Sequence, residues 1–233
     1  MRNNSDFIFV VPFRAGSKGF KDKNISNLNG IPLYVHTLNQ ALSFCGAEVF
    51  ATTDYPINQL TGFPKDVNHI LRESHLCTDE TTMSDVITEF ILKNVKRKAT
   101  IVLLQVTSPL RSVGDIESAI SVFVDSKFDL VMTVSKTDSS VLKYGLITDV
   151  GLFSPIHSSK SCFQNRQDLP SVYRPNGMIY IFDSEWFLEN QGFATDNIGV
   201  FITPSERSID IDSAADLEKA ARYLKIKNLN RGL

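Results

Sequence analysis

Short apolar runs alternate with segments of helical periodicity along nearly the whole chain, and this alternation restricts the possible folds more than any other feature. Residues 6–12 and 100–105 are continuous apolar runs, as long as a strand that is buried on both faces. Residues 32–44 follow the first run, with apolar residues at helical spacing and a proline at the start. The same pattern predicts further strands at 48–52, 67–71, 129–134, 178–182 and 200–203, and helices at 81–95, 113–124, 184–190 and 214–223. Strands separated by helices need crossover connections, so we predict a three-layer α/β fold, a mostly parallel sheet with helices on both faces.

Composition and charge indicate a globular protein without a general affinity for polyanions. The 233 residues suit one domain, 42% of them are hydrophobic, 21% are charged, and the formal net charge is -2. We therefore expect no nucleic acid and no membrane among the partners. The apolar run at 7–13 is too short to cross a membrane and lacks a cleavage site, and Cys45, Cys77 and Cys162 share no metal-ligand spacing. A cytoplasmic location with free thiols is the simplest interpretation.

The segment from 135 to 173 interrupts the alternation. It is polar, rich in serine and almost without periodicity. A structureless loop of this length is uncommon in a compact domain, so we predict an excursion that packs on a partner subunit. The predicted organisation is one domain over residues 1–233, with an inserted dimerisation arm at about 135–173.

A basic, glycine-containing segment follows the first predicted strand. Residues 14–24 (RAGSKGFKDKN) include four cations within ten residues: Arg14, Lys18, Lys21 and Lys23. Ligands of parallel sheets bind beyond the carboxyl ends of the strands, and a glycine-rich turn there presents N–H groups to phosphate. The segment matches neither G-x-x-x-x-G-K-[ST] nor G-x-G-x-x-G. A solvated basic loop is the alternative, and the position after a strand favours a polyphosphate site.

A pair of carboxylates near the end of the chain indicates a divalent cation site. In the sequence 208–212 (SIDID), an extended backbone directs Asp210 and Asp212 to one face, with Cα atoms roughly 6.5–7 Å apart. Mg²⁺ takes one or two carboxylates and completes its shell with water and phosphate oxygens. The alternative is that Asp212 or Ser213 only caps the last helix.

Two further segments carry polar side chains that could face the same crevice. Gln105, Thr107 and Arg111 follow the second apolar strand, and Arg166 or Arg174 has the planar fork that binds a carboxylate. Surface arginines are the alternative for the last two. The four histidines form neither a metal-ligand pattern nor a triad, which leaves metal-hydrolase and serine-hydrolase interpretations without support.

Taken together and in order, these segments resemble the acylneuraminate cytidylyltransferase family, the CMP-sialic acid synthetases. The matching motifs cover nearly the whole chain: RAGSKGFKDKN at 14–24, NGIPL at 29–33, TTD at 52–54, QVTSPLR at 105–111, RQDLP at 166–170, RPNGMIYI at 174–181 and SIDID at 208–212. The resemblance implies a Rossmann-like α/β fold with an arm that exchanges contacts in a homodimer. It also implies transfer of CMP from CTP to the anomeric hydroxyl of an acidic nine-carbon sugar, with Mg²⁺ (or Mn²⁺) as cofactor.

The resemblance assigns roles position by position. CTP binding is implied for Arg14, Ser17, Lys18, Lys23, Asn24, Arg72, Thr107 and Ser108. Sugar or partner-arm contacts are implied for Gln105, Lys143, Arg166, Asn176, Tyr180 and Phe193. Metal binding is implied for Asp210 and Asp212, and the catalytic group consists of Arg14, Lys23 and Asp212.

The sequence also departs from the family pattern, and the departures leave the identity of the sugar open. Phe13 and Ala15 flank Arg14 where smaller or polar residues are usual, and Ala194 stands where the sialic acid enzymes can carry a second aromatic residue. N-acetylneuraminic, legionaminic and pseudaminic acids therefore all remain candidate sugars. A Kdo cytidylyltransferase fits less well, because those enzymes tend to carry arginine at the position of Lys18 and lack the SIDID ending. A non-catalytic nucleotide-sugar binding protein could have the same fold, and so could a uridylyl- or guanylyltransferase.

Overall fold

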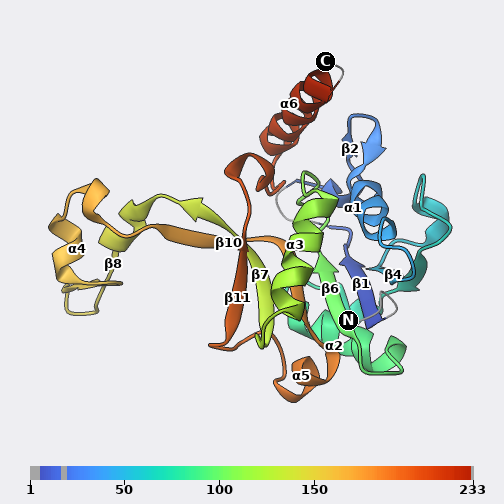
Figure 1. Cartoon of the computed structure of the whole chain (residues 1–233), viewed down its shortest axis with the longest axis horizontal. Helices are drawn as coiled ribbons and strands as arrows, with labels where there is room; N and C mark the ends of the chain where they lie inside the picture. Colours follow the sequence, from blue (N-terminus) through green and yellow to red (C-terminus); the bar gives the residue numbers. More distant parts are fainter. Residues whose placement is uncertain (1–5, 17–19, 232–233) are drawn as a thin grey trace.

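A single sheet forms the middle layer of the protein (Figure 1). The structure is a computed structural model and describes residues 6–16 and 20–231, the side chains of 227–231 excepted. Within these residues the central sheet has seven strands in the order β11-β7-β10-β6-β1-β4-β5. They are β1 (Phe7–Pro12), β4 (Glu48–Thr53), β5 (Asn68–Leu71), β6 (Thr100–Leu104), β7 (Leu130–Thr137), β10 (Val172–Asp183) and β11 (Ile198–Ile202).

The direction of the strands confirms the predicted mostly parallel α/β sheet, with one exception. β1 is parallel to β4 and to β6, β4 is parallel to β5, and β11 is parallel to β7. β10 runs antiparallel to both of its neighbours, β6 and β7. Hydrophobic periodicity contains no information on strand direction, so the sequence did not predict this reversal.

Helices cover both faces of the sheet because the central strands are apolar on both sides. Phe9 and Val11 of β1 face a core shared with α1 (Leu33–Leu42), α3 (Val113–Val124) and α6 (Ala214–Arg231). Ile8 and Val10 face the opposite core, shared with α2 (Met83–Asn94) and α5 (Ser184–Glu189). Among the described residues, no helix is long and apolar enough to cross a membrane.

Short elements complete the chain between these strands and helices. They are η2 (Lys23–Ile25), β2 (Asn27–Leu28), β3 (Ile31–Pro32), η3 (Ile57–Gln59), η4 (Ser74–Leu76), η5 (Ser139–Lys143), β8 (Gly145–Ile147), β9 (Phe153–Pro155), α4 (Ser159–Phe163), η6 (Arg166–Asp168) and η7 (Ser205–Arg207). Capping boxes fix the starts of the two longer crossover helices: Thr82 with Asp85 begins α2, and Ser112 with Asp115 begins α3.

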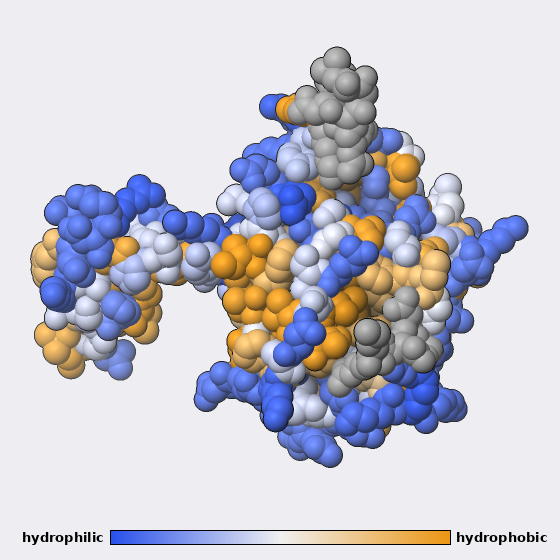
Figure 2. All heavy atoms as spheres, viewed as in Figure 1, coloured by the Kyte–Doolittle hydropathy of each residue, from blue (hydrophilic) through white to orange (hydrophobic). Residues whose placement is uncertain are grey.

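The polar segment that interrupts the alternation leaves the sheet as an arm (Figure 1). The ends of β7 and β10 pair with each other beyond the sheet, with Thr137 opposite Val172 and Ser135 opposite Arg174. β8, β9 and α4 stand on this two-stranded stem, and Figure 2 shows apolar side chains on their surface. Contact of this arm with a partner subunit remains a prediction.

An ion pair with a buried carboxylate holds the segment that follows β11 against α3. Arg207 donates from Nε to the Asp115 carboxylate at 3.1 Å and from a second nitrogen to its other oxygen. The Asp115 side chain is only 2% exposed. Burial alone raises the pKa of Asp115, but hydrogen bonds from Arg207 and Ser112 outweigh it, and the pKa lies below its usual value.

We predict that Asp115→Asn lowers the free energy of unfolding by about 2–4 kcal/mol at pH 7, because Arg207 loses its buried partner. A depressed carboxyl pKa contributes stability above the unfolded-state pKa, about 3.9, and this contribution is lost as the pH falls through the folded-state pKa. In urea unfolding at pH 3–7, the free energy of unfolding should therefore fall less on acidification for the variant than for the wild type. Glu117→Gln, on the exposed side of the same helix, is the control and should stay within about 0.5 kcal/mol. Equal stabilities of the two variants would contradict the role of the pair.

Candidate active site

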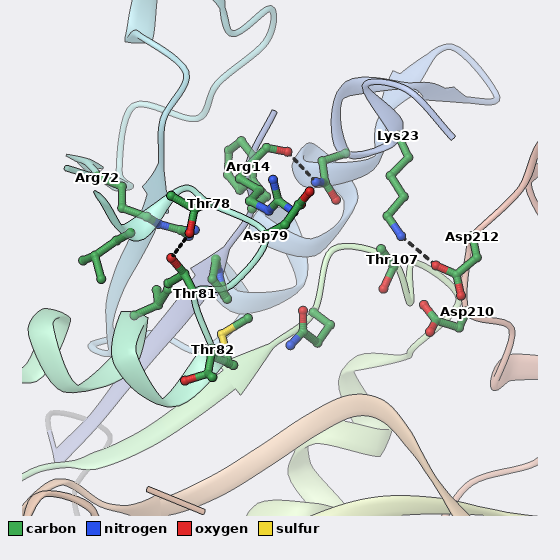
Figure 3. A pocket seen from close by; sticks show the side chains of 17 residues that line it. Arg14, Lys23, Arg72, Thr78, Asp79, Thr81, Thr82, Thr107, Asp210 and Asp212 are labelled. Carbon is green, nitrogen blue, oxygen red and sulfur yellow. Dashed lines mark hydrogen bonds and ion pairs between the residues drawn. The ribbon is translucent and has the colours of Figure 1, made fainter. Parts of the chain in front are cut away.

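A cleft of about 620 Å³ opens at the carboxyl ends of the parallel strands (Figure 3). Its walls come from segments that are far apart in the sequence: the end of β1, η2, the loop between β5 and α2, the turn after β6, and the segment before α6. Eight of the residues selected from the sequence line it: Arg14, Lys23, Asn24, Arg72, Gln105, Thr107, Asp210 and Asp212. This geometry agrees with the expectation that ligands bind beyond the carboxyl ends of the strands.

The basic segment after β1 is fixed at both ends by hydrogen bonds. The side-chain amide of Asn24 is buried and donates to the carbonyl of Arg14 at 2.8 Å, so that it closes the neck of the loop. The Ala15 N–H donates to the Asp54 carboxylate at 2.8 Å. Asn24 thus has a structural role in addition to its position on the cleft wall. Ser17 and Lys18, both predicted to bind CTP, lie outside the described residues.

The carboxylates of Asp210 and Asp212 face the cleft together, as the alternation of the SIDID sequence predicts (Figure 3). Ile211 between them is fully buried, and its N–H donates to the Thr107 carbonyl at 2.8 Å. Neighbouring groups displace water from Asp210 and raise its pKa, and the charge of Asp212 adds to the rise. The Thr107 hydroxyl and the cation of Lys23 act in the opposite direction and favour the ionised form.

Two cations of the cleft, Lys23 and Arg14, are paired with carboxylates of the same chain. Lys23 Nζ lies 2.6 Å from Asp212 Oδ1, across 189 positions of sequence. The guanidinium of Arg14 donates to the carboxylate of Asp79 and to the carbonyl of Cys77, the latter at 3.3 Å. Sequence reasoning missed Asp79. Asp79 lies in the segment that follows β5, at the carboxyl end of a parallel strand, and this position could have identified it as a candidate together with Arg72.

Arg72 is held at the cleft wall by the backbone of β4. Its guanidinium donates to the Thr52 carbonyl at 2.8 Å, and its own N–H donates to the Thr53 carbonyl at 2.7 Å. Burial lowers the pKa of Arg72. A fixed planar donor at this place can hydrogen-bond an uncharged acceptor such as a base carbonyl.

Two residues of the turn after β6 are buried instead of facing the cleft. Arg111, expected in the crevice, is 2% exposed and donates to the carbonyls of Gln105 and Met178. Burial lowers its pKa to about 9. Through these hydrogen bonds Arg111 stabilises the backbone behind the cleft. Ser108 is 1% exposed and does not line the cleft, so its contact with CTP remains a prediction.

The residues implied for the sugar lie in four different places, and of these residues Gln105 alone lines the cleft. Lys143 and Arg166 are on the arm, where Lys143 donates to the Gln164 carbonyl at 2.6 Å and Arg166 pairs with Asp138 at 2.7 Å. Asn176 is in the core, where it hydrogen-bonds the hydroxyls of Thr133, Thr203 and Ser208. Lys143, Arg166 and Asn176 thus do not line the cleft of their own chain.

Tyr180 and Phe193 form an aromatic surface on the α5 side of the sheet. Their ring centroids are 5.7 Å apart, and Phe193 packs further on Phe182 and Phe187. Burial raises the pKa of Tyr180, and the charge of Asp210 contributes to this rise. Both rings are partly buried against the core on the α5 side of the sheet, and neither lines the cleft.

A mostly parallel sheet with a cationic loop and paired carboxylates at its carboxyl edge is typical of α/β proteins that bind phosphorylated ligands. A family model described as "Cytidylyltransferase" matches residues 8–225, and the chain therefore belongs to the cytidylyltransferase family. This membership confirms the resemblance stated from the motifs.

Individual relatives agree with this assignment. The chain is 30% identical over 212 residues to the N-acylneuraminate cytidylyltransferase of Streptococcus agalactiae serotype V, a match that covers 90% of this chain and 51% of that protein. It is 26% identical over 233 residues to the CMP-N,N'-diacetyllegionaminic acid synthase of Campylobacter jejuni subsp. jejuni serotype O:2, which covers 97% of this chain and 98% of that protein. The chain thus spans about half the length of the first relative and nearly all of the second.

The fold also has solved counterparts. A structure of CMP:2-keto-3-deoxy-manno-octonic acid synthetase complexed with CTP aligns with a TM-score of 0.70 and 19% identity, covering 95% of this chain and 99% of that one. This likeness confirms the Rossmann-like α/β fold.

Proposed function

We propose that the protein transfers CMP from CTP to the anomeric hydroxyl of a nonulosonic acid and releases pyrophosphate. The observation that carries the proposal is the meeting of two cations of the basic loop with a pair of carboxylates in one cleft, although Lys23 and Asp212 are 189 positions apart. The relatives named for sialic and legionaminic acid activation support the same reaction and substrate class.

The chemistry follows from the charges of the reactants. A bond forms between the anomeric oxygen and the α-phosphorus of CTP, the bond from that phosphorus to the pyrophosphate oxygen breaks, and the hydroxyl proton is released. Both reactants are anions, so the main contributions of the protein are charge neutralisation and alignment. In this proposal Arg14 and Lys23 bind the phosphates of CTP. Arg72 lies beside the base, and Gln105 and Thr107 lie between nucleotide and sugar.

The proposal includes a divalent cation, Mg²⁺ or Mn²⁺, held by Asp210 and Asp212. Two carboxylates on one wall of a cleft fit the oxygen ligands that these cations prefer. Burial raises the pKa of Asp210, and a bound cation would stabilise its ionised form. When bound, such a cation supplies Lewis-acid stabilisation of phosphate oxygens.

The proposal also includes a cytoplasmic homodimer in which the arm of one protomer packs on its partner. The exposed apolar residues of the arm support this, since Phe163 is 89% exposed and Leu146 and Ile147 are each 70% exposed. A cluster of such side chains marks an interaction surface more often than free surface. In the dimer, Lys143 and Arg166 of the arm would reach the sugar bound by the other protomer.

Pyrophosphate release tests the reaction directly. We predict release from CTP and Mg²⁺ with one of three nonulosonic acids, N-acetylneuraminic, legionaminic or pseudaminic acid, and none with Kdo offered in parallel. UTP and GTP in place of CTP should give little release. Release with none of the four, or with Kdo alone, would contradict the proposed sugar class.

Replacing one carboxylate tests the metal site. We predict that Asp212→Asn lowers turnover by two or more orders of magnitude without loss of the folded state, because a catalytic metal ligand and its charge are lost. Glu206→Gln, an exposed carboxylate nearby, is the matched control and should keep near-normal turnover. Thermal melting of both variants establishes folding. Near-normal turnover of Asp212→Asn would end the assignment of the metal site.

The arm is tested by oligomeric state. We predict a mass of twice 26.0 kDa in sedimentation equilibrium. The double substitution Leu146→Asp and Phe163→Asp should give a monomer that still binds CTP but turns over poorly. Ile57→Asp, on an exposed apolar residue of the body, should leave the dimer intact. A wild-type monomer, or a dimer unaffected by the double substitution, would contradict the role of the arm.

A further inference from the structure

The guanidinium of Arg14 has an anionic partner from its own chain in the cleft (Figure 3). Asp79, 65 positions further along the chain, accepts a hydrogen bond from one terminal nitrogen. The other terminal nitrogen donates to the backbone carbonyl of Cys77, in the same loop, at 3.3 Å. The side chains of Arg14 and Asp79 are 29% and 34% exposed, so the pair is accessible from the cleft. Two contacts from one short loop thus occupy the group that is proposed to bind phosphate.

The two ion pairs of the cleft, Lys23–Asp212 and Arg14–Asp79, respond differently to the binding of a nucleotide. If CTP enters with a divalent cation, Lys23 exchanges Asp212 for phosphate, and Asp212 exchanges Lys23 for the cation. Arg14 likewise gains phosphate oxygens, but these oxygens offer no hydrogen to the Asp79 carboxylate and carry the same sign of charge. Asp79 therefore loses favourable electrostatic energy when phosphate binds at Arg14.

We propose that Asp79 is an internal counter-ion that competes with the phosphates of CTP for Arg14 and so lowers the affinity of the protein for the nucleotide. This inference rests on the proposed function, because it takes Arg14 as a phosphate ligand. Before CTP binds, Asp79 orients the guanidinium of Arg14. When CTP is bound, the Asp79 carboxylate repels its phosphates, and this repulsion lowers the affinity for the nucleotide.

Calorimetric titration of CTP, in EDTA and again in Mg²⁺, tests the inference. Asp79→Asn should bind CTP roughly two- to fivefold more tightly than wild type in both buffers, the range expected from releasing a partly exposed ion pair. Asp212→Asn should bind more tightly in EDTA, where Asp212 competes with phosphate for Lys23, and more weakly in Mg²⁺, where the Asp212 carboxylate binds the cation that accompanies CTP. Thermal melting confirms that each variant is folded.

Two controls separate competition for Arg14 from the general field of the cleft. Glu80→Gln removes the same charge one position away, and among the described residues Glu80 forms no ion pair, so its affinity for CTP should equal that of wild type. In an Arg14→Ala background, Asp79→Asn should no longer change the affinity. Unchanged or weaker binding by Asp79→Asn overturns the inference and makes Asp79 a residue that orients Arg14. An equal gain in Glu80→Gln also overturns it.

A different result would contradict the proposed function: the wild-type protein would bind no CTP in either buffer. In that case the role of Asp79 is tested with inorganic tripolyphosphate as the probe. Tighter binding by Asp79→Asn than by wild type supports competition for Arg14, and equal, weaker or absent binding overturns it.

Discussion

The candidate site depends on the attachment of one segment, residues 207–212, to the edge of the sheet. Arg207 binds the buried Asp115 at the start of α3, and Ile211 is buried while its N–H donates to the carbonyl of Thr107 at 2.8 Å. These contacts leave Asp210 and Asp212 with a single direction to face, toward the cleft. Without them the last part of the chain would have no fixed relation to the basic loop that follows β1.

Once that segment is fixed, opposite charges must coexist in one small volume. The protein pairs two cations of the cleft with its own carboxylates, Lys23 with Asp212 and Arg14 with Asp79. In the proposed complex, an anionic phosphate chain together with a divalent cation would exchange partners with the first of these pairs. The pairs keep the side chains oriented before a ligand arrives, and they give a physical reason why affinity for an isolated nucleotide should be modest.

Much of this arrangement follows from sequence patterns, and the exceptions have physical reasons. Periodicity predicted the strands and helices because it reports which residues meet a core, but it does not report direction, so the reversal of β10 was not foreseen. The alternation in SIDID correctly predicted the orientation of Asp210 and Asp212. Arg111 was placed in the crevice by its neighbours in sequence, whereas in three dimensions it donates to buried carbonyls. Asp79 belongs to a polar loop without periodicity, and only the fold brings it to Arg14.

The measurement that tests this account most directly is a crystal structure of the protein with CTP and Mn²⁺, whose anomalous scattering locates the metal. The account predicts a Mn²⁺ peak beside the carboxylates of Asp210 and Asp212, with the phosphates next to Arg14 and Lys23 and the base near Arg72. A nucleotide bound outside the cleft, or a metal away from both carboxylates, would contradict it.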